Sequence, residues 1–222
     1  MRYLALASDY DGTLATDGVV DQETVEALRR LAATGRKLIL VTGRQLGDLL
    51  RAFPEAGSFE AVVAENGGVL YRPQNGTNRV LAPTPSSQFV EALQRRGIAP
   101  LWVGQVVVAT VQPNDTLVSE VIRELDLDLQ VILNKGSVMV LPGSVDKSTG
   151  LRAALDDLAL DAENVVAVGD AENDQAFLAM CGCGVAVANA LDGLKAAAGH
   201  VTRAEAGAGV REIIEALIAG DR

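Results

Sequence analysis

The chain has 222 residues, 49% of them hydrophobic and 4% aromatic, and its 29 acidic and 19 basic side chains give a net charge of −10. This length exceeds a common single domain of about 100 to 150 residues, so one core domain with a smaller second unit fits best. The composition excludes a disordered or collagen-like chain, and the negative charge disfavours nucleic acid and anionic lipid as partners.

The sequence shows no targeting or membrane segment. Residues 1–8 lead directly into two aspartates and leave no room for a signal peptide, and no later apolar run approaches the roughly 18 residues of a membrane span. We therefore expect a cytoplasmic protein that has no membrane partner. The sequence leaves open whether the protein is a monomer or a homodimer.

The first part of the chain alternates short apolar runs with segments of helical periodicity. The apolar runs have the length of strands that are buried on both faces. In chain order the predicted elements are a strand over 4–8, a helix over 21–34, a strand over 37–41, a helix ending near Pro54, a strand over 61–64 and a small hairpin from residue 69.

Two turn-rich segments, 83–87 and 141–144, bracket the middle of the chain. The roughly 60 residues between them are too many for a plain loop. We therefore predict an inserted α+β cap over residues 83–143. The elements predicted inside it are helices over 88–96 and 116–124, and strands over 101–103, 106–111, 129–133 and 138–141.

The last part of the chain returns to the alternation, with strands over 165–168 and 184–187, a helix from near Leu191, a Gly-rich loop over 204–209 and a final helix. Right-handed crossovers between parallel strands place helices on both faces of a sheet. We therefore predict an α/β fold with a Rossmann-like parallel sheet. Its core would comprise residues 1–82 and 144–222.

Two aspartates follow the first predicted strand, in the segment Asp9-Tyr10-Asp11-Gly12-Thr13. In extended chain, residues two apart project to the same side, so the carboxylates of Asp9 and Asp11 would meet. Neighbouring carboxylates repel unless a cation joins them, and Mg²⁺ prefers carboxylate, water and phosphate oxygens. The alternative is a solvated acidic turn, which the buried strand before it disfavours.

A second acidic pair, Asp170 and Asp174, follows the strand over 165–168. Their spacing places both on one face of the first turn of a helix, where the helix dipole favours carboxylates. Binding sites of open parallel sheets form at the carboxyl ends of strands, so the two acidic pairs should converge. Ordinary helix capping by Asp170 explains this motif equally well in isolation.

Two more segments offer groups for an anionic substrate. Thr42-Gly43-Arg44 provides a hydroxyl, an unhindered backbone amide and a helix N-terminus, which suit a phosphate oxygen, although a Thr N-cap is an equally good interpretation. Lys147 begins a predicted helix, where the dipole disfavours a cation, so a functional role is expected for it.

Together these residues resemble the four motifs of the haloacid dehalogenase superfamily of phosphohydrolases, which occur here in order as Asp9 to Thr13, Thr42, Lys147, and Gly169-Asp170 with Asp174. The position of the insertion resembles the branch that contains Cof-type sugar phosphatases, sucrose-phosphate phosphatase and archaeal phosphoglycolate phosphatase. One departure is visible, because that branch usually has Gly after the lysine and this chain has Ser148-Thr149-Gly150.

The resemblance implies a phosphatase that forms a phospho-aspartate. Asp9 would attack phosphorus, and Asp11 would protonate the leaving alcohol and later activate the hydrolytic water. Thr42 and Lys147 would bind the oxygens of the transferring phosphoryl group.

The resemblance also implies Mg²⁺ as cofactor. The ion would be held by Asp9, the backbone carbonyl of Asp11 and Asp170, with Asp174 binding it directly or through water. Charge neutralisation would then supply most of the rate. Further residues expected to contact or orient the phosphate are Gly43, Arg44, Asn66 and Asn173.

Two other functions are compatible with paired carboxylates at the edge of a parallel sheet. A phosphomutase of this superfamily shares the chemistry of Asp9 and Asp11, but it usually carries a helical cap between the first and second motifs, where this chain has a short segment. A phospho-receiver module places its acceptor Asp after the third strand, where this chain has Glu65-Asn66, and it has no use for a large insertion.

The expected partner is a small-molecule phosphate ester. The short insertion resembles the small cap of phosphoglycolate phosphatase, which favours a compact acid or a sugar phosphate. Asn134 and Lys135, in a turn between predicted strands of the insertion, are polar enough to reach the substrate, although a solvated hairpin turn is the favoured interpretation.

Overall fold

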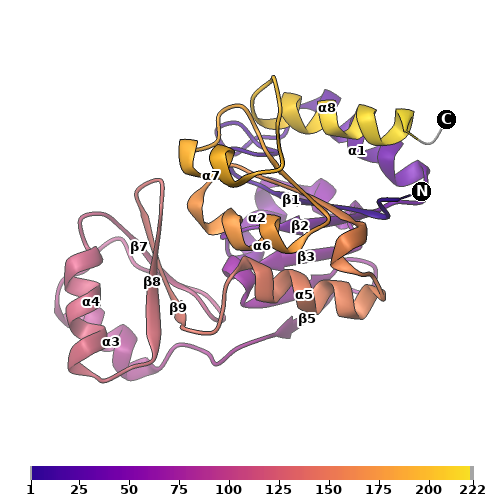
Figure 1. Ribbon diagram of the computed structural model, residues 1–222. Helices are drawn as coiled ribbons and strands as arrows, with labels where there is room; N and C mark the ends of the chain where they lie inside the picture. Colours follow the sequence, from indigo (N-terminus) through magenta and orange to yellow (C-terminus); the bar gives the residue numbers. More distant parts are fainter. Residues whose placement is uncertain (1, 221–222) are drawn as a thin grey trace.

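The computed structural model, which describes residues 2–220, has a large sheet covered by helices and a smaller sheet beside it (Figure 1). The large sheet has the strand order β12-β11-β10-β1-β2-β3-β4-β5. Its strands from β12 to β3 are parallel, and β4 and β5 form an antiparallel edge. The predicted α/β fold with a Rossmann-like parallel sheet is confirmed.

The strands of the large sheet are short and mostly buried, as the apolar runs predict. Those at its centre are completely buried, which explains why they lack the alternation of a half-exposed strand. The strands are β1 (Ala5–Asp9), β2 (Lys37–Val41), β3 (Ala61–Ala64), β4 (Val69–Arg72), β5 (Thr77–Val80), β10 (Val165–Gly169), β11 (Cys183–Ala186) and β12 (His200–Val201).

Helices cover both faces of this sheet (Figure 1). The helices α1 (Gln22–Ala33) and α8 (Ala206–Ala219) pack against each other, as do α5 (Lys147–Leu158) and α6 (Gln175–Met180). Shorter helices, α2 (Leu46–Ala52) and α7 (Asp192–Ala197), follow β2 and β11. This arrangement directs the loops after β1, β2, β3 and β10 to one edge of the sheet.

The segment between β5 and α5, which we call the cap, forms the smaller sheet with the strand order β6-β7-β9-β8. Apolar side chains of its two helices and its sheet form a separate cluster around Phe89 and Val140. The domain division at residues 83 and 143 remains a prediction. The cap elements are α3 (Ser87–Arg95), β6 (Trp102–Val103), β7 (Val108–Val111), α4 (Asp115–Glu124), β8 (Leu129–Asn134) and β9 (Ser137–Pro142).

The prediction of a loop over 204–209 is wrong, because α8 already begins at Ala206. Glycine normally weakens a helix, but these glycines allow close packing. A Cβ on Gly207 would lie 2.6 Å from Thr24 Oγ1, and one on Gly209 would lie 2.5 Å from Thr202 Oγ1. Tertiary packing therefore overrides helix propensity in this turn.

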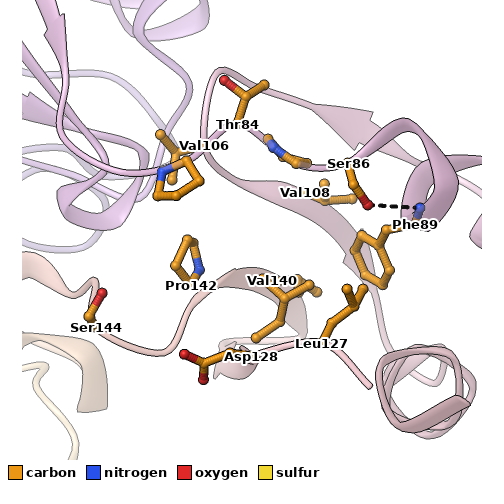
Figure 2. Close-up of a pocket in the computed structure, with 13 residues that line it drawn as sticks. Thr84, Ser86, Phe89, Val106, Val108, Leu127, Asp128, Val140, Pro142 and Ser144 are labelled. Atoms are coloured by element: carbon orange, nitrogen blue, oxygen red, sulfur yellow. Dashed lines mark hydrogen bonds between the residues drawn. The ribbon is translucent and has the colours of Figure 1, made fainter. Parts of the chain in front are cut away.

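Both connections between the cap and the large sheet border a cavity of about 350 Å³ (Figure 2). One wall comes from Thr84 and Ser86, whose hydroxyl accepts the backbone N–H of Phe89 at 3.2 Å and begins α3. The opposite wall includes Pro142 and Ser144. The lining is mostly apolar, with Asp128 as its one titratable side chain, and the cavity lies at the junction of the cap and the large sheet.

Gly150 tests how tightly α5 must pack. A Cβ at this position would lie 2.5 Å from Val63 Cγ1 and 2.6 Å from the Cα of Gly67. We expect Gly150→Ala to lower the free energy of unfolding by about 1–3 kcal/mol, because overpacking displaces the helix. The measurement is urea denaturation. Gly193→Ala in α7, where a Cβ meets nothing within 4 Å, is the control and should be neutral or stabilising. Equal values for the two variants would contradict the packing argument.

Candidate active site

Four loops and one helix terminus bring polar side chains to the carboxyl edge of the parallel sheet. The loops follow β1, β2, β3 and β10, and the helix is α5. Segments more than a hundred residues apart in the chain meet there, as is usual for open α/β sheets. All the predicted site residues lie in these segments: Asp9, Asp11, Thr42, Gly43, Arg44, Asn66, Lys147, Asp170, Asn173 and Asp174.

Three carboxylates lie together at the bottom of this site. One oxygen of each of Asp9, Asp170 and Asp174 lies within 4.8 Å of the others, and all three residues are buried. Lys147 is equally buried, and its Nζ donates to Asp9 Oδ1 at 2.6 Å and to Asp174 Oδ1 at 2.5 Å. The predicted convergence of the two acidic segments is therefore present in the structure.

The environment of these groups shifts their pKa values. Burial raises the pKa of Asp9 to about 8, against the opposing effect of the Lys147 ammonium. Burial also raises the pKa of Asp170. Burial alone would lower the pKa of Lys147, but the carboxylates of Asp174 and Asp9 outweigh it and raise that pKa. The raised pKa values show that burial disfavours the charged forms of Asp9 and Asp170, so a metal ion bound between them would favour ionisation of both.

The donor set fits a hard divalent ion. Mg²⁺ is bound in proteins by one or two carboxylates together with waters and phosphate oxygens, and Asp9 and Asp170 offer such oxygens. Asp174 is further engaged, because its Oδ2 accepts the backbone N–H groups of Asp170 and Ala171 at 2.8 and 2.9 Å. The residues present can therefore bind a metal ion, with Asp174 fixing the backbone of the loop that carries Asp170.

The side chain of Asp11 lies outside this trio, contrary to the expectation that the carboxylates of Asp9 and Asp11 project to the same side. The strand β1 ends at Asp9, and the chain then turns, so the extended geometry behind that expectation stops one residue too early. Asp11 instead accepts two hydrogen bonds from Arg44, at 2.7 and 2.6 Å. The Arg44 guanidinium also stacks 4.9 Å above the ring of Tyr10.

The geometry of Asp170 and Asp174 also differs from the predicted helical turn. Residues 172–174 form a short 3₁₀ turn, and α6 begins only at Gln175. The tighter turn brings the carboxylate of Asp174 back onto the N–H of Asp170. Only glycine fits at position 169 here, because a Cβ on Gly169 would lie 2.7 Å from the carboxylate of Asp174.

Two asparagines lie beside the carboxylates, Asn66 buried and Asn173 partly buried. Asn173 Nδ2 donates to Asn66 Oδ1 at 2.8 Å, while Asn66 Nδ2 and Asn173 Oδ1 have no hydrogen-bond partner among the described residues. Unpaired buried polar atoms are costly, so a ligand that pairs with them gains affinity. Thr42 is also buried, and its hydroxyl accepts the N–H of Arg44 at 3.1 Å. These groups can bind a phosphate.

The cap closes the site from the other side. A cleft of about 520 Å³ lies between the loops of the large sheet and one face of the cap sheet, where Trp102, Ala109 and Met139 lie in neighbouring strands. Lys135, at the tip of the hairpin between β8 and β9, reaches across the cleft and its ammonium binds the carboxylate of Asp170. The favoured interpretation of a solvated hairpin turn is thus wrong for Lys135.

Two other residues stabilise the loop after β1, and the sequence did not predict either of them as a site residue. The hydroxyl of Thr13 donates to Asp170 Oδ1 at 3.2 Å, and Asn189 Nδ2 donates to the carbonyl of Gly12 at 2.8 Å. Gly12 has φ +85°, and a Cβ on it would clash with Asp170 and Lys135. The only sequence signal for Asn189 is its place after β11, another strand end at the same edge.

Comparison with known proteins gives the family. A family model described as haloacid dehalogenase-like hydrolase matches residues 6–117 and 105–214. The chain belongs to this family. A phosphoglycolate phosphatase of Methanothermobacter thermautotrophicus is 35% identical over 220 residues, which cover 95% of this chain and 96% of the relative. The predicted superfamily is therefore confirmed, and so is the prediction of a phosphatase.

Solved structures of haloacid dehalogenase-like proteins share the fold. A haloacid dehalogenase-like hydrolase from Bacteroides thetaiotaomicron superposes with a TM-score of 0.84 at 21% identity, covering 97% of this chain and 99% of that one. A sugar phosphatase of subclass IIB of the superfamily superposes with a TM-score of 0.79 at 18% identity, covering 96% and 98%. None of the described helices is long and apolar enough to cross a membrane.

The acidic trio predicts that metal stabilises this hydrolase. Addition of Mg²⁺ should raise the melting temperature above that in chelator, because an ion bound only by the folded state contributes about 2.7 kcal/mol at a hundred times its dissociation constant. Asp170→Asn should weaken this response, and Asp192→Asn, at a fully exposed side chain, should retain it. Differential scanning fluorimetry measures both. A full response in Asp170→Asn would contradict the site.

Proposed function

We propose that the protein is a Mg²⁺-dependent phosphomonoester hydrolase that works through a phospho-aspartate on Asp9. The observation that carries the proposal is the buried cluster in which Asp9 faces Lys147 and two further aspartates. Asp9, Asp170 and the backbone carbonyl of Asp11 would hold the ion. Bound there, Mg²⁺ neutralises charge on the transferring phosphoryl group.

In the first step, a carboxylate oxygen of Asp9 attacks phosphorus, and the bond from phosphorus to the ester oxygen breaks. Asp11 gives its proton to the departing oxygen, which leaves as an alcohol. Lys147 binds a phosphoryl oxygen, and its anchoring by Asp174 fixes the direction of its ammonium. Thr42 and Asn66 provide further donors, of which Asn66 Nδ2 is buried without another partner among the described residues.

In the second step, Asp11 accepts a proton from water as that water attacks the phosphorus of phospho-Asp9. The bond from phosphorus to the Asp9 oxygen breaks, which releases inorganic phosphate, restores the Asp9 carboxylate and leaves Asp11 protonated for the next cycle. Arg44 supports this role, because its two hydrogen bonds hold the Asp11 carboxylate at the wall of the cleft, where water has access. Splitting the reaction in this way replaces one difficult step with two easier ones.

The substrate that fits best is a short phosphorylated acid such as phosphoglycolate. The Lys135 ammonium contacts Asp170, one of whose carboxylate oxygens lies within 4.8 Å of an Asp9 oxygen, so little space separates the cap cation from the attacked phosphorus. A cation at that distance suits a carboxylate on a two-carbon leaving group. The archaeal relative described above is a phosphoglycolate phosphatase, which supports the same substrate. The sugar phosphatase shares only the fold with this chain.

The roles of the two aspartates after β1 can be separated by isosteric variants. Asp9→Asn should reduce turnover of para-nitrophenyl phosphate with Mg²⁺ at least ~1,000-fold, because the nucleophile is lost. Its melting temperature should change little, since Lys147 keeps Asp174 as partner. Asp11→Asn should slow turnover by about 10²- to 10⁴-fold and still bind phosphate. Full activity in Asp9→Asn would require another nucleophile, and an Asp11→Asn rate within about threefold of wild type would remove its acid–base role.

Lys135 should determine the preference for an acidic leaving group. We expect Lys135→Gln to lower kcat/KM for 2-phosphoglycolate about tenfold or more, because a charge-assisted hydrogen bond contributes about 1.5–3 kcal/mol. Ethyl phosphate has the same length and no carboxylate, so its kcat/KM should change much less. Lys195→Gln, in α7 and outside the lining of the cleft, is the matched control. Equal losses with both esters would contradict a leaving-group role for Lys135.

A further inference from the structure

A buried carboxylate of the large sheet is held by backbone amides of the cap. Glu65 follows β3 and is 2% exposed. Its Oε1 accepts the N–H of Gln105 at 3.1 Å, and its Oε2 accepts those of Val106 and Val107 at 2.7 and 3.0 Å. Within residues 2–220 no lysine or arginine pairs with this carboxylate. Three successive N–H groups converging on one anion form a strong, directional contact.

Close packing surrounds this contact. A Cβ on Gly104 would lie 2.5 Å from Glu65 Oε2, so the loop can approach the carboxylate only because residue 104 has no side chain. On the other side, a Cβ on Gly68 would lie 2.6 Å from the Cβ of Val106. The loop over 104–107 is therefore fitted onto the turn after β3 at short range on both sides of the hydrogen bonds.

The backbone of that turn is unusual. Glu65 and Asn66 have φ values of +51° and +54°, and two consecutive non-glycine residues in the left-handed region are unfavourable. The turn is stabilised by its contacts, because the N–H of Glu65 donates to the carbonyl of Arg44 and that of Asn66 to the carbonyl of Thr42, both at 2.9 Å. The conformation that aims Glu65 at the cap thus also sets the loop that carries Thr42 and Arg44.

The same turn reaches the remaining catalytic groups. Asn66 accepts the amide of Asn173, and Gly67, with φ +104°, lies so close to the carbonyl of Asp146 that it has no room for a Cβ. Asp146 caps α5 and directly precedes Lys147. The turn over 65–67 therefore contacts the cap, the loop after β2, the loop after β10 and the N-terminus of α5.

Glu65 adds a buried connection between the cap and the large sheet to the two covalent linkers and to the contact of Lys135 with Asp170. Both linkers border the cavity at the junction of the cap and the large sheet, which Val106 also lines (Figure 2). The three hydrogen bonds to Glu65 hold the loop over 104–107 of the cap against the turn after β3 of the large sheet. Val107 makes one of these hydrogen bonds, and the side chains of Val107 and Ala109 form part of the wall of the active-site cleft.

We propose that Glu65 is a positioning residue that anchors the cap on the turn after β3, so that the substrate-facing wall of the cleft is held in register with the phosphoryl-binding loops. The kinetic part of this proposal rests on the proposed phosphatase function, whereas the anchoring itself does not. A leaving group that reaches the cap depends on the anchor, and one that does not reach it is independent of the anchor.

The test compares Glu65→Gln with Glu91→Gln, which removes the same charge from an exposed position of α3. In Glu65→Gln, one acceptor oxygen is replaced by a donor that faces an N–H, so hydrogen–deuterium exchange of the amides of residues 105–107 should accelerate about tenfold or more. KM for 2-phosphoglycolate should rise about tenfold, while methyl phosphate, whose leaving group is a single carbon, should change less than about twofold. Glu91→Gln should match wild type in every measurement.

A second variant reaches the same contact from the cap. Gly104→Ala places a methyl group against the carboxylate and should give the same exchange and kinetic changes without altering Glu65. In a double-mutant cycle, Gly104→Ala should add little to Glu65→Gln, because the contact is already weakened. Unchanged exchange at residues 105–107 in both single variants would overturn the anchor. Faster exchange with equal effects on the two esters would overturn its role in positioning. The exchange data decide the anchor even if wild type hydrolyses no phosphate ester.

Discussion

The site depends on the repulsion among three buried carboxylates and on what opposes it. Asp9, Asp170 and Asp174 meet because the neighbouring parallel strands β1 and β10 end at one edge of the sheet, and all three residues are buried. The ammonium of Lys147 neutralises part of this charge and remains protonated, because its pKa is raised by the same carboxylates. A metal ion bound there would neutralise the remaining negative charge and favour an anionic ligand such as the proposed phosphate ester.

The same electrostatic demand explains which neighbours the fold supplies. Gly12 and Gly169 leave space for carboxylates where any side chain would clash. Backbone N–H groups hold Asp174, and the hydroxyl of Thr13 holds Asp170, so each acid is fixed by a hydrogen bond before a metal ion binds. Such preorganisation lets the site stabilise charge in the transition state without reorganising its own dipoles.

Local pattern was enough to predict most of the fold and the residues of the acidic cluster. Strands such as residues 37–41 and 61–64 are short apolar runs whose ends coincide with turn residues, and the spacing of the aspartates marks the strand ends. The partners of Lys135 and Glu65 could not be predicted, because each contact joins residues 35 or more positions apart and depends on the orientation of the cap. The prediction that the Asp11 side chain points to the same side as that of Asp9 is wrong for a local reason. The strand ends at Asp9, so the chain is already in a turn where extended geometry was expected.

Under the proposed function, the cap would make the site selective among phosphate esters. In the proposed reaction, the groups that would act on phosphorus all come from the large sheet and α5, whereas the cap lines the other side of the cleft with residues such as Lys135 and Trp102. Selectivity then requires that the two sets keep a fixed separation, since a displacement of about 1 Å can cost catalysis ~100-fold. Two covalent linkers alone would not fix that separation. A buried carboxylate that accepts hydrogen bonds from three backbone N–H groups of the cap can fix it. We therefore expect the contact made by Glu65 to affect the reaction as well as the fold.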